Sequence, residues 1–202
     1  MKAQQIGRHL LSRLSAPAGR GKRPLETPVE PGSGTPGAHQ SGQGVRGRGF
    51  FIGIDPGKTG AAVAISRDLI LVHDWKSPEA AREFFKLVLE QGRIEMAVIE
   101  DVDQKRMPHK GRFGAYGLGL SSGFWQMLCI CFGVAYQLLP PGEWQKAVLM
   151  PGGGKDSKAR SMATVRALYP GLREYIFLRS RHHHRADAAL LAHYAVRTSG
   201  RK

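Results

Sequence analysis

The run FFIGIDPGKTGAAVAI at residues 50–65 constrains the fold of this chain more than any other stretch. Its first six residues read as a buried strand that ends in Asp55, and Pro56 and Gly57 then turn the chain. The apolar run AAVAI follows after a short turn, and LILVHDW at residues 69–75 reads as a further strand. Three strands joined by short turns predict a β-meander.

The clearest helix signals in the chain follow at residues 77–92, SPEAAREFFKLVLEQG. Ser77 is suited to the N-cap, Pro78 to the first helical position and Glu79 to the first turn. Gly92 is a typical stop after the last apolar residue of the pattern. These residues predict an amphipathic helix.

The rest of the chain alternates between strand and helix patterns. We expect strands in EMAVIEDV and VAYQLLP, the second one buried, and a glycine-rich helix in AYGLGLSSGFWQMLCICFG at residues 115–133. Helices are also expected in PGEWQKAVL, in KDSKARSMATVRALYP and in RADAALLAHYAVR, the last one beginning near His184. This order predicts a mixed α/β sheet with helices on its faces.

Composition divides the chain into a basic tail, residues 1–49, and one domain, residues 50–202. The tail is rich in Gly, Pro, Arg and Ser and is predicted to be disordered. Its first 25 residues resemble an organelle transit peptide, which would place the protein in a mitochondrion or chloroplast. The alternative is a plain basic extension, with the protein in the cytoplasm or nucleoid of a bacterium or of a phage host.

The charge of the chain favours a polyanionic partner. Thirty Lys and Arg face sixteen Asp and Glu, a formal net charge of +14, and this excess attracts nucleic acid. A merely basic soluble surface is the alternative interpretation. The longest apolar stretch, residues 124–140, is short and interrupted, so no membrane association is expected. The two cysteines, Cys129 and Cys131, are too close in sequence to pair and are expected to be buried thiols.

GIDPGKTG looks like a phosphate-binding loop, but its spacing is wrong. A Walker loop has four residues between its first Gly and the Gly-Lys pair and opens a helix. Here Gly53 and Gly57 have three residues between them, and a strand follows. In PGGGKDS, Asp156 stands where a hydroxyl is required. We therefore expect no nucleotide cofactor.

Three carboxylates lie at the ends of, or within, apolar segments, where a role in a functional site is expected. Asp55 and Glu100 each end an apolar strand, and Asp187 interrupts the apolar pattern of the last helix. Singly they read as a turn former, a strand-end charge and a helix N-terminal charge. Burying all three close together is costly unless a cation lies between them. The set predicts a divalent metal site.

In order, FIGIDPGKTGAAVAI, AVIED and HHHRADAALLAHYA resemble the RuvC family of Holliday junction resolvases, within the RNase H-like superfamily. The resemblance covers most of residues 50–197, and the intervening segments are similar to those of the phage and organellar branch. It implies an RNase H-like mixed five-stranded sheet flanked by helices. It also implies a homodimer that resolves four-way DNA junctions by paired symmetric nicks, with two Mg²⁺ or Mn²⁺ ions in each active site.

The resemblance assigns metal ligation and catalysis to named positions. Asp55 and Glu100 match the shared strand ligands, and Asp187 matches the ligand on the last helix. Family members carry a second acid or a His three or four residues before that ligand. Here those positions hold His184 and His183; His184 shares a helix face with Asp187 and is taken as the fourth ligand, with His183 as the alternative.

The remaining predicted site residues would meet DNA. Lys155 is implied to neutralise the scissile phosphate, and Trp144 is expected to be a packing anchor. The residues expected to contact the DNA backbone or, for Phe113, to stack on bases are Lys105, Arg106, Lys110, Arg112, Phe113, Lys146 and Lys158. Exposed helix charges and, for Phe113, a core position are the alternatives.

Two other functions share these residues. An RNase H-like nuclease acting on RNA–DNA hybrids would use the same acids. A catalytically weak junction-binding relative is suggested by histidine in place of the second acid of the last helix. Substrate preference separates the first from a resolvase, and binding without cutting identifies the second.

Overall fold

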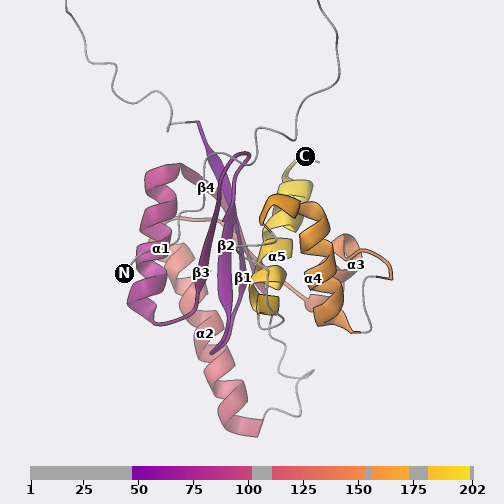
Figure 1. Cartoon of the computed structure of the whole chain (residues 1–202). Coiled ribbons are helices and arrows are strands. Elements are labelled where there is room, and N and C mark those ends of the chain that lie inside the picture. Colours follow the sequence, from indigo (N-terminus) through magenta and orange to yellow (C-terminus); the bar gives the residue numbers. More distant parts are fainter. Residues whose placement is uncertain (1–46, 102–110, 153–155, 173–181, 201–202) are drawn as a thin grey trace, which may run out of the picture.

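A computed structural model describes residues 47–101, 111–152, 156–172 and 182–200 of the chain, shown in Figure 1. Residues 1–46 of the predicted tail, together with Lys105, Arg106, Lys110, Lys155 and the side chain of Arg112, lie outside the described residues. Gly49, which was assigned to the tail, is the first residue of the first strand. In chain order the elements are β1 (Gly49–Asp55), β2 (Ala61–Ile65), β3 (Ile70–Asp74), α1 (Pro78–Gln91), β4 (Arg93–Glu100), α2 (Gly111–Cys131), β5 (Tyr136–Leu139), α3 (Pro141–Val148), α4 (Ser157–Leu168), a 3-10 turn (Pro170–Leu172) and α5 (His183–Ser199).

The strands form one mixed sheet in the order β3-β2-β1-β4-β5. The first three strands pair antiparallel as the predicted meander, whereas β4 and β5 pair parallel to β1 and to each other. The parallel strands are reached through α1 and α2, as crossover connections require. The mixed five-stranded sheet flanked by helices, expected of an RNase H-like domain, is confirmed.

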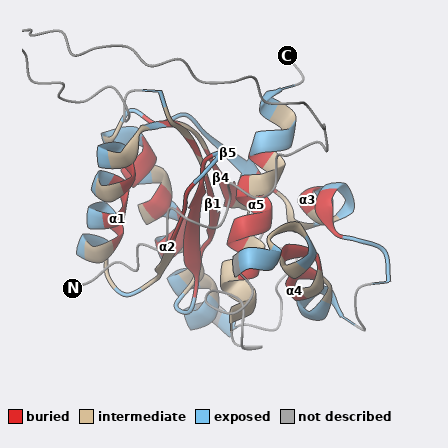
Figure 2. Cartoon of the chain, turned by 45° about the horizontal axis from the view of Figure 1, so that its top comes forward, coloured by how far each residue is buried: buried red, intermediate tan, exposed pale blue. Residues whose placement is uncertain are grey.

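Helices cover both faces of the sheet, as Figures 1 and 2 show. A hydrophobic core lies on each face of the sheet. Successive side chains of a strand point to opposite faces, so alternate residues of β1 face different cores. Phe50, Ile52 and Ile54 pack with α1 and α2 on one face. On the other face Val63 and Val98 pack with α3, α4 and α5. The sheet is therefore buried on both sides, in red in Figure 2.

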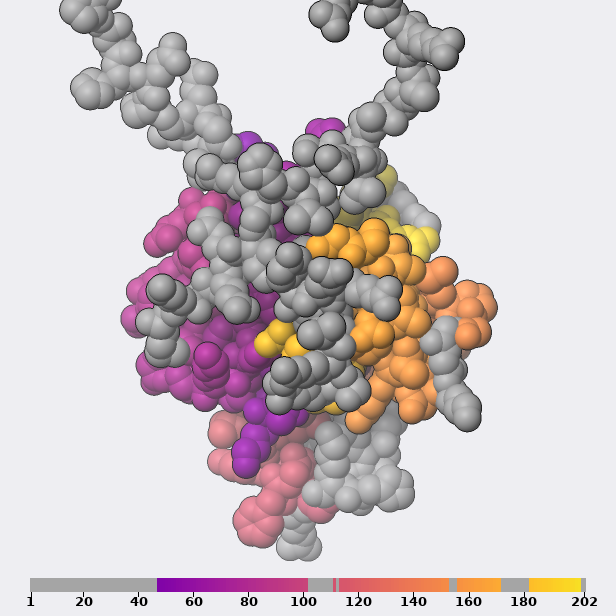
Figure 3. Space-filling model, in the orientation of Figure 1, coloured from indigo at the N-terminus to yellow at the C-terminus, as the bar shows by residue number. Residues whose placement is uncertain are grey.

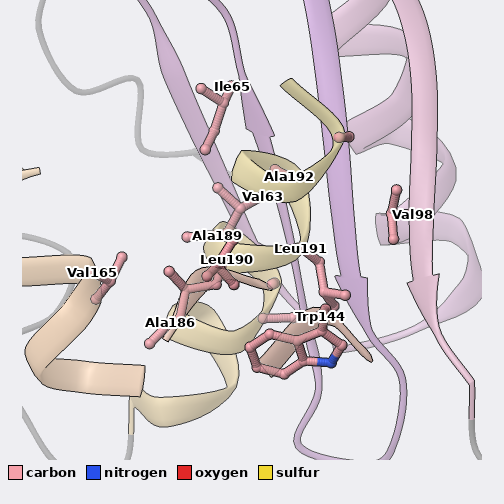
Figure 4. Packing of buried hydrophobic residues seen from close by; sticks show 14 of the residues in the cluster. Val63, Ile65, Val98, Trp144, Val165, Ala186, Ala189, Leu190, Leu191 and Ala192 are labelled. Carbon is pink, nitrogen blue, oxygen red and sulfur yellow. The ribbon is translucent and has the colours of Figure 1, made fainter. Parts of the chain in front are cut away.

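Helix α5 lies directly on β1 because β1 has no side chain at Gly53. A Cβ atom at Gly53 would come 1.9 Å from the carbonyl oxygen of Ala188 and 2.3 Å from the backbone nitrogen of Ala192. The small residues of α5 pack into the second core, as Figure 4 shows for Ala189 and Ala192. This close approach fixes where the first turns of α5 lie relative to the end of β1.

The helix predicted at residues 78–91 is confirmed with its ends. The Ser77 hydroxyl accepts a hydrogen bond from the backbone N–H of Ala80 at 3.2 Å. The N–H of Gly92 donates to the carbonyl of Val88 at 3.0 Å. Both ends thus satisfy backbone groups that a helix otherwise leaves unpaired.

Three expectations about the middle of the chain are wrong. The glycine-rich helix begins at Gly111 rather than at residue 115, so Phe113 is helical and not part of a loop. Strand β5 is an edge strand in which only Leu139 is buried. Cys129 is buried, but Cys131 is exposed at the end of α2. The two cysteines do not pair, as expected.

Among the described helices, none is both long and apolar enough to cross a membrane. Helix α2, with 21 residues, meets the length but is interrupted by glycine and polar residues as far as Gln126.

Replacing Gly53 by Ala is expected to destabilise the protein by about 3 kcal/mol, since the added methyl group meets backbone atoms that cannot rotate away. Urea denaturation followed by circular dichroism measures the change. Gly142→Ala on α3 is the control, because nothing lies within 4 Å of its added Cβ, and its effect should stay within about 1 kcal/mol. A loss below that size for Gly53→Ala would contradict the close packing of α5 on β1.

Candidate active site at the carboxyl ends of β1 and β4

Asp55 and Glu100 stand side by side because they end two adjacent parallel strands. The register pairs Ile54 of β1 with Ile99 of β4, and Asp55 and Glu100 are the next residues of these strands. Asp55 is only 6% exposed. The end of a parallel sheet segment thus carries two carboxylates at one place, as the sequence predicted.

Helix α5 brings a histidine onto Asp55. The Nδ1 atom of His184 lies 2.6 Å from Oδ2 of Asp55, and its Nε2 atom lies 3.0 Å from the hydroxyl of Thr59. With the carboxylate ionised, Nδ1–H donates to Asp55, and the Thr59 hydroxyl donates to Nε2 when the ring is neutral. The ring of His183 lies beside that of His184, with centroids 3.9 Å apart.

The first turn of α5 is tied to the sheet by an ion pair. The Nε–H of Arg185 donates to Oδ1 of Asp74, at the end of β3, at 2.6 Å, and a second N–H of Arg185 reaches the other oxygen of Asp74. The hydrogen bond from Arg185 holds the pKa of Asp74 below its usual value. Because Arg185 follows His184 directly, this two-pronged contact fixes the backbone that carries His184.

Asp187 is a partly buried carboxyl whose pKa is raised to about 7. The main cause is burial, and the charge of Asp55 adds to it; nearby His184, Lys158 and Ser161 act in the opposite direction. Within the described part of the chain the buried hydroxyl of Ser161 makes no hydrogen bond of ordinary geometry, so it acts on Asp187 only as a nearby dipole. At neutral pH a large fraction of Asp187 is therefore protonated.

Glu100 accepts a hydrogen bond from the buried side chain of Trp144. The indole N–H of Trp144, on α3, donates to Oε1 of Glu100 at 3.0 Å, and Trp144 is fully buried. The prediction of Trp144 as a packing anchor is thus correct, but the residue also contacts a predicted ligand.

These groups line one cavity of about 1360 Å³. Its ionisable and polar lining gathers at the strand ends, whereas α2 and the start of α1 supply an apolar wall. The lining residues used below are Asp55, Lys58, Thr59, Glu100, Lys158, His183, His184 and Asp187, with Trp75, Phe113, Leu120, Phe124 and Met127 on the apolar wall. All three predicted carboxylates and both candidate histidines therefore meet at the same hollow.

The cavity is lined by the types of side chain that bind divalent cations. Carboxylate oxygens suit Mg²⁺ and Mn²⁺, and imidazole is a common further ligand of Mn²⁺-type ions. Burial, and to a smaller extent the charge of Asp55, raises the pKa of Asp187, and a cation nearby would favour its ionised form. No three or more His, Cys, Asp or Glu side chains in the described ranges are yet gathered closely enough to hold one ion.

The predicted DNA contacts are only partly within the described structure. Lys158 is exposed and lines the cavity, and Lys146 is exposed on α3. Phe113 is 93% exposed, so its alternative placement in the core is wrong. Figure 3 shows the first turns of α2, which carry Phe113, at the lower edge of the molecule. The basic residues of the preceding loop lie outside the described residues.

Sequence reasoning missed the residues that hold the ligands in place. Thr59 lies in the same turn as Asp55, so its proximity was readable from the spacing. Arg185 and Asp74, which are in contact, are separated by 111 positions in the sequence. Trp144 and Glu100 are separated by 44 positions. No local pattern marks such pairs.

Solved structures similar to this chain include two of RuvC from Thermus thermophilus. RuvC of Thermus thermophilus in complex with a Holliday junction substrate shares 20% sequence identity over 74% of this chain and 95% of its own, with a TM-score of 0.48. A second Thermus thermophilus RuvC structure shares 20% identity over 74% of this chain and 96% of its own, with a TM-score of 0.47. No protein-family model and no curated protein matches the chain. The phage and organellar branch stays a prediction.

Asp187→Asn is expected to stabilise the metal-free protein at pH 8 and to have little effect near pH 4. The folded protein holds the proton of Asp187 up to about pH 7, whereas the unfolded chain releases it near 3.8. Stability of the wild type therefore falls as the pH rises through this window, by up to about 4 kcal/mol. Urea denaturation in EDTA at both pH values measures the difference.

The control is Asp74→Asn, whose effect should have the opposite sign. Because Arg185 lowers the pKa of Asp74, this carboxylate contributes stability above its unfolded pKa and loses it as the pH falls. Asp74→Asn should therefore destabilise the protein at pH 8. Equal effects of Asp187→Asn at the two pH values would contradict a partly buried carboxyl with a raised pKa.

Proposed function

We propose that this protein is a metal-dependent endonuclease that resolves four-way DNA junctions by paired symmetric nicks. The observation that carries the proposal is the meeting of Asp55, Glu100 and Asp187 with His184 at one cavity. The ordered motifs that resemble RuvC resolvases support the junction as substrate. The net charge of +14 supports a nucleic acid partner.

The carboxylates would hold the metal ions. Asp55 and Glu100, fixed at the strand ends, and Asp187 with His184, carried by α5, are the proposed ligands of two Mg²⁺ or Mn²⁺ ions. When bound, such ions neutralise charge at the phosphodiester and favour ionisation of an attacking water. Asp187 must release its proton to ligate, and its pKa of about 7 makes that release easy at neutral pH once a cation is near.

Two exposed lysines are placed to receive the phosphate. Lys58, in the turn after β1, and Lys158, at the start of α4, both line the cavity that holds the acids. Their ammonium groups attract the phosphodiester toward carboxylates that would otherwise repel it. Lys155, three residues before Lys158, keeps its proposed role beside the scissile phosphate.

We also propose that α2 forms the homodimer interface. Apolar or small residues recur along it with the alternating spacing of three and four that packs one helix against another. They carry no charge and are exposed in the single chain: Phe113, Tyr116, Leu120, Gly123, Met127 and Ile130. Because Phe113, Leu120, Gly123 and Met127 also line the cavity, the proposed interface would border the active site. Tyr136 and Leu138 of the edge strand β5 are also partly exposed. A twofold contact between two such surfaces is self-complementary.

The proposed activity is tested on a labelled immobile four-way junction, beside linear duplex and an RNA–DNA hybrid, with and without Mg²⁺. We expect paired symmetric nicks on the junction only, dependent on Mg²⁺ and abolished by Asp55→Asn. Asp68→Asn is the matched control, because this acid is ion-paired with Arg48 away from the cavity, and it should cut as the wild type does.

Two outcomes would replace the proposal. Cutting of the hybrid alone would identify an RNase H-like nuclease of another substrate class. Tight junction binding without cutting in Mg²⁺ or Mn²⁺ would identify a junction-binding relative. The engagement of both ring nitrogens of His184 by Asp55 and Thr59 is the observation that favours this second candidate.

Ile130→Glu is expected to convert the dimer to a monomer at micromolar concentration, because it places a charge on the apolar α2 surface, near the carboxyl-terminal end of the helix. Ile130 is 60% exposed and does not line the cavity, so the fold and the site should be unaffected. Leu89→Glu on α1, at a partly exposed apolar position, is the control and should stay dimeric. A wild type that sediments as a monomer in analytical ultracentrifugation would overturn the interface.

A further inference from the structure

We infer that Trp144 is a positioning residue for Glu100, and that it sets the affinity of the site for divalent cations through its indole N–H. This inference rests on the proposed function, since it concerns the ligand that Glu100 would provide. It depends on one hydrogen bond, from Nε1 of Trp144 to Oε1 of Glu100 at 3.0 Å.

The fold delivers Trp144 to Glu100 by a short route. Glu100 pairs with Leu139 in the parallel ladder, and the N–H of Asp101 donates to the carbonyl of Leu139 at 2.9 Å. Helix α3 begins only two residues later, at Pro141. Trp144 therefore lies in the first turn of a helix that starts beside the end of β4.

The indole ring has little freedom to move. Trp144 is 0% exposed and belongs to the core cluster with Val98, Leu190 and Leu191. Figure 4 shows its ring beside Leu191 of α5. The carbonyl of Ala147, further along α3, accepts a hydrogen bond from Arg197 of α5 at 3.0 Å. A rigid donor restricts the rotation of the Glu100 carboxylate at the edge of the cavity.

Orientation of a ligand by a neighbouring donor changes metal affinity. A glutamate side chain loses considerable rotamer freedom when it is fixed. If the hydrogen bond from Trp144 already restricts Glu100 in the metal-free protein, metal binding has a smaller entropy cost. Loss of such outer contacts costs roughly 10-fold to 100-fold in metal affinity in known metalloproteins. Trp144 thus has a role at the site although it does not line the cavity.

The chain contains a matched control for this role. Trp125 is also 0% exposed, in the core on the opposite face of the sheet. Within the described part of the chain its Nε1 atom has no hydrogen-bond partner. Trp144→Phe and Trp125→Phe both exchange a buried indole for a phenyl ring, but only the first removes a donor from Glu100.

The test measures Mn²⁺ binding by isothermal titration calorimetry for the wild type and the two variants. We expect Trp144→Phe to weaken binding roughly 10-fold or more, and Trp125→Phe to bind as the wild type does. Equal affinities for the two variants would overturn the role of Trp144. A wild type that binds no Mn²⁺ would overturn the proposed function and, with it, this role.

A second measurement uses the metal-free wild type and does not depend on the folding of Trp144→Phe. The chain has three tryptophans, and the ¹H–¹⁵N spectrum resolves their indole N–H groups. Glu100→Ala should shift the Trp144 indole proton upfield, since its acceptor is lost, and leave the Trp125 resonance in place. An unchanged Trp144 resonance would show that the indole does not hold Glu100, whatever the protein cleaves.

Discussion

The site depends on the close contact between α5 and β1 at Gly53. Because no side chain separates the two elements there, the backbone of α5 at Ala188 and Ala192 lies against the strand. The residues one turn earlier on α5 then fall at the end of β1. His184 reaches Asp55 and Asp187 enters the same cavity. A larger residue at Gly53 would lift the helix and separate the proposed ligands.

Electrostatics and burial oppose each other in this arrangement. Asp55 is buried and Asp187 is partly buried beside it; burial, together with the charge of Asp55, raises the pKa of Asp187 to about 7. Ion pairs elsewhere hold the framework that permits this: Arg185 with Asp74 fixes the first turn of α5. The fold thus gathers acidic groups at an electrostatic cost that the proposed cation would offset.

Much of this structure was predictable from local sequence patterns. The strand ends marked by Asp55 and Glu100, and the helix capped by Ser77 and Gly92, follow from turn and capping chemistry that acts over a few residues. The start of α2 was predicted too late because glycines at 111 and 114 suggested a loop. A glycine costs a helix only about 1 kcal/mol, and an existing helix extends through such a residue readily.

The parts that could not be predicted depend on tertiary neighbours. Strand β5 has the apolar composition of a buried strand, but its place at the sheet edge leaves Tyr136 and Leu138 partly exposed. The contact of His184 rather than His183 with Asp55 depends on the rotation of α5. The contact between Trp144 and Glu100 required the packing of α3.

The most direct test of the proposed site is an anomalous difference map from crystals grown with Mn²⁺. The account predicts density between Asp55, Glu100 and Asp187 in the cavity; Mn²⁺ bound only elsewhere, or not at all, would contradict it.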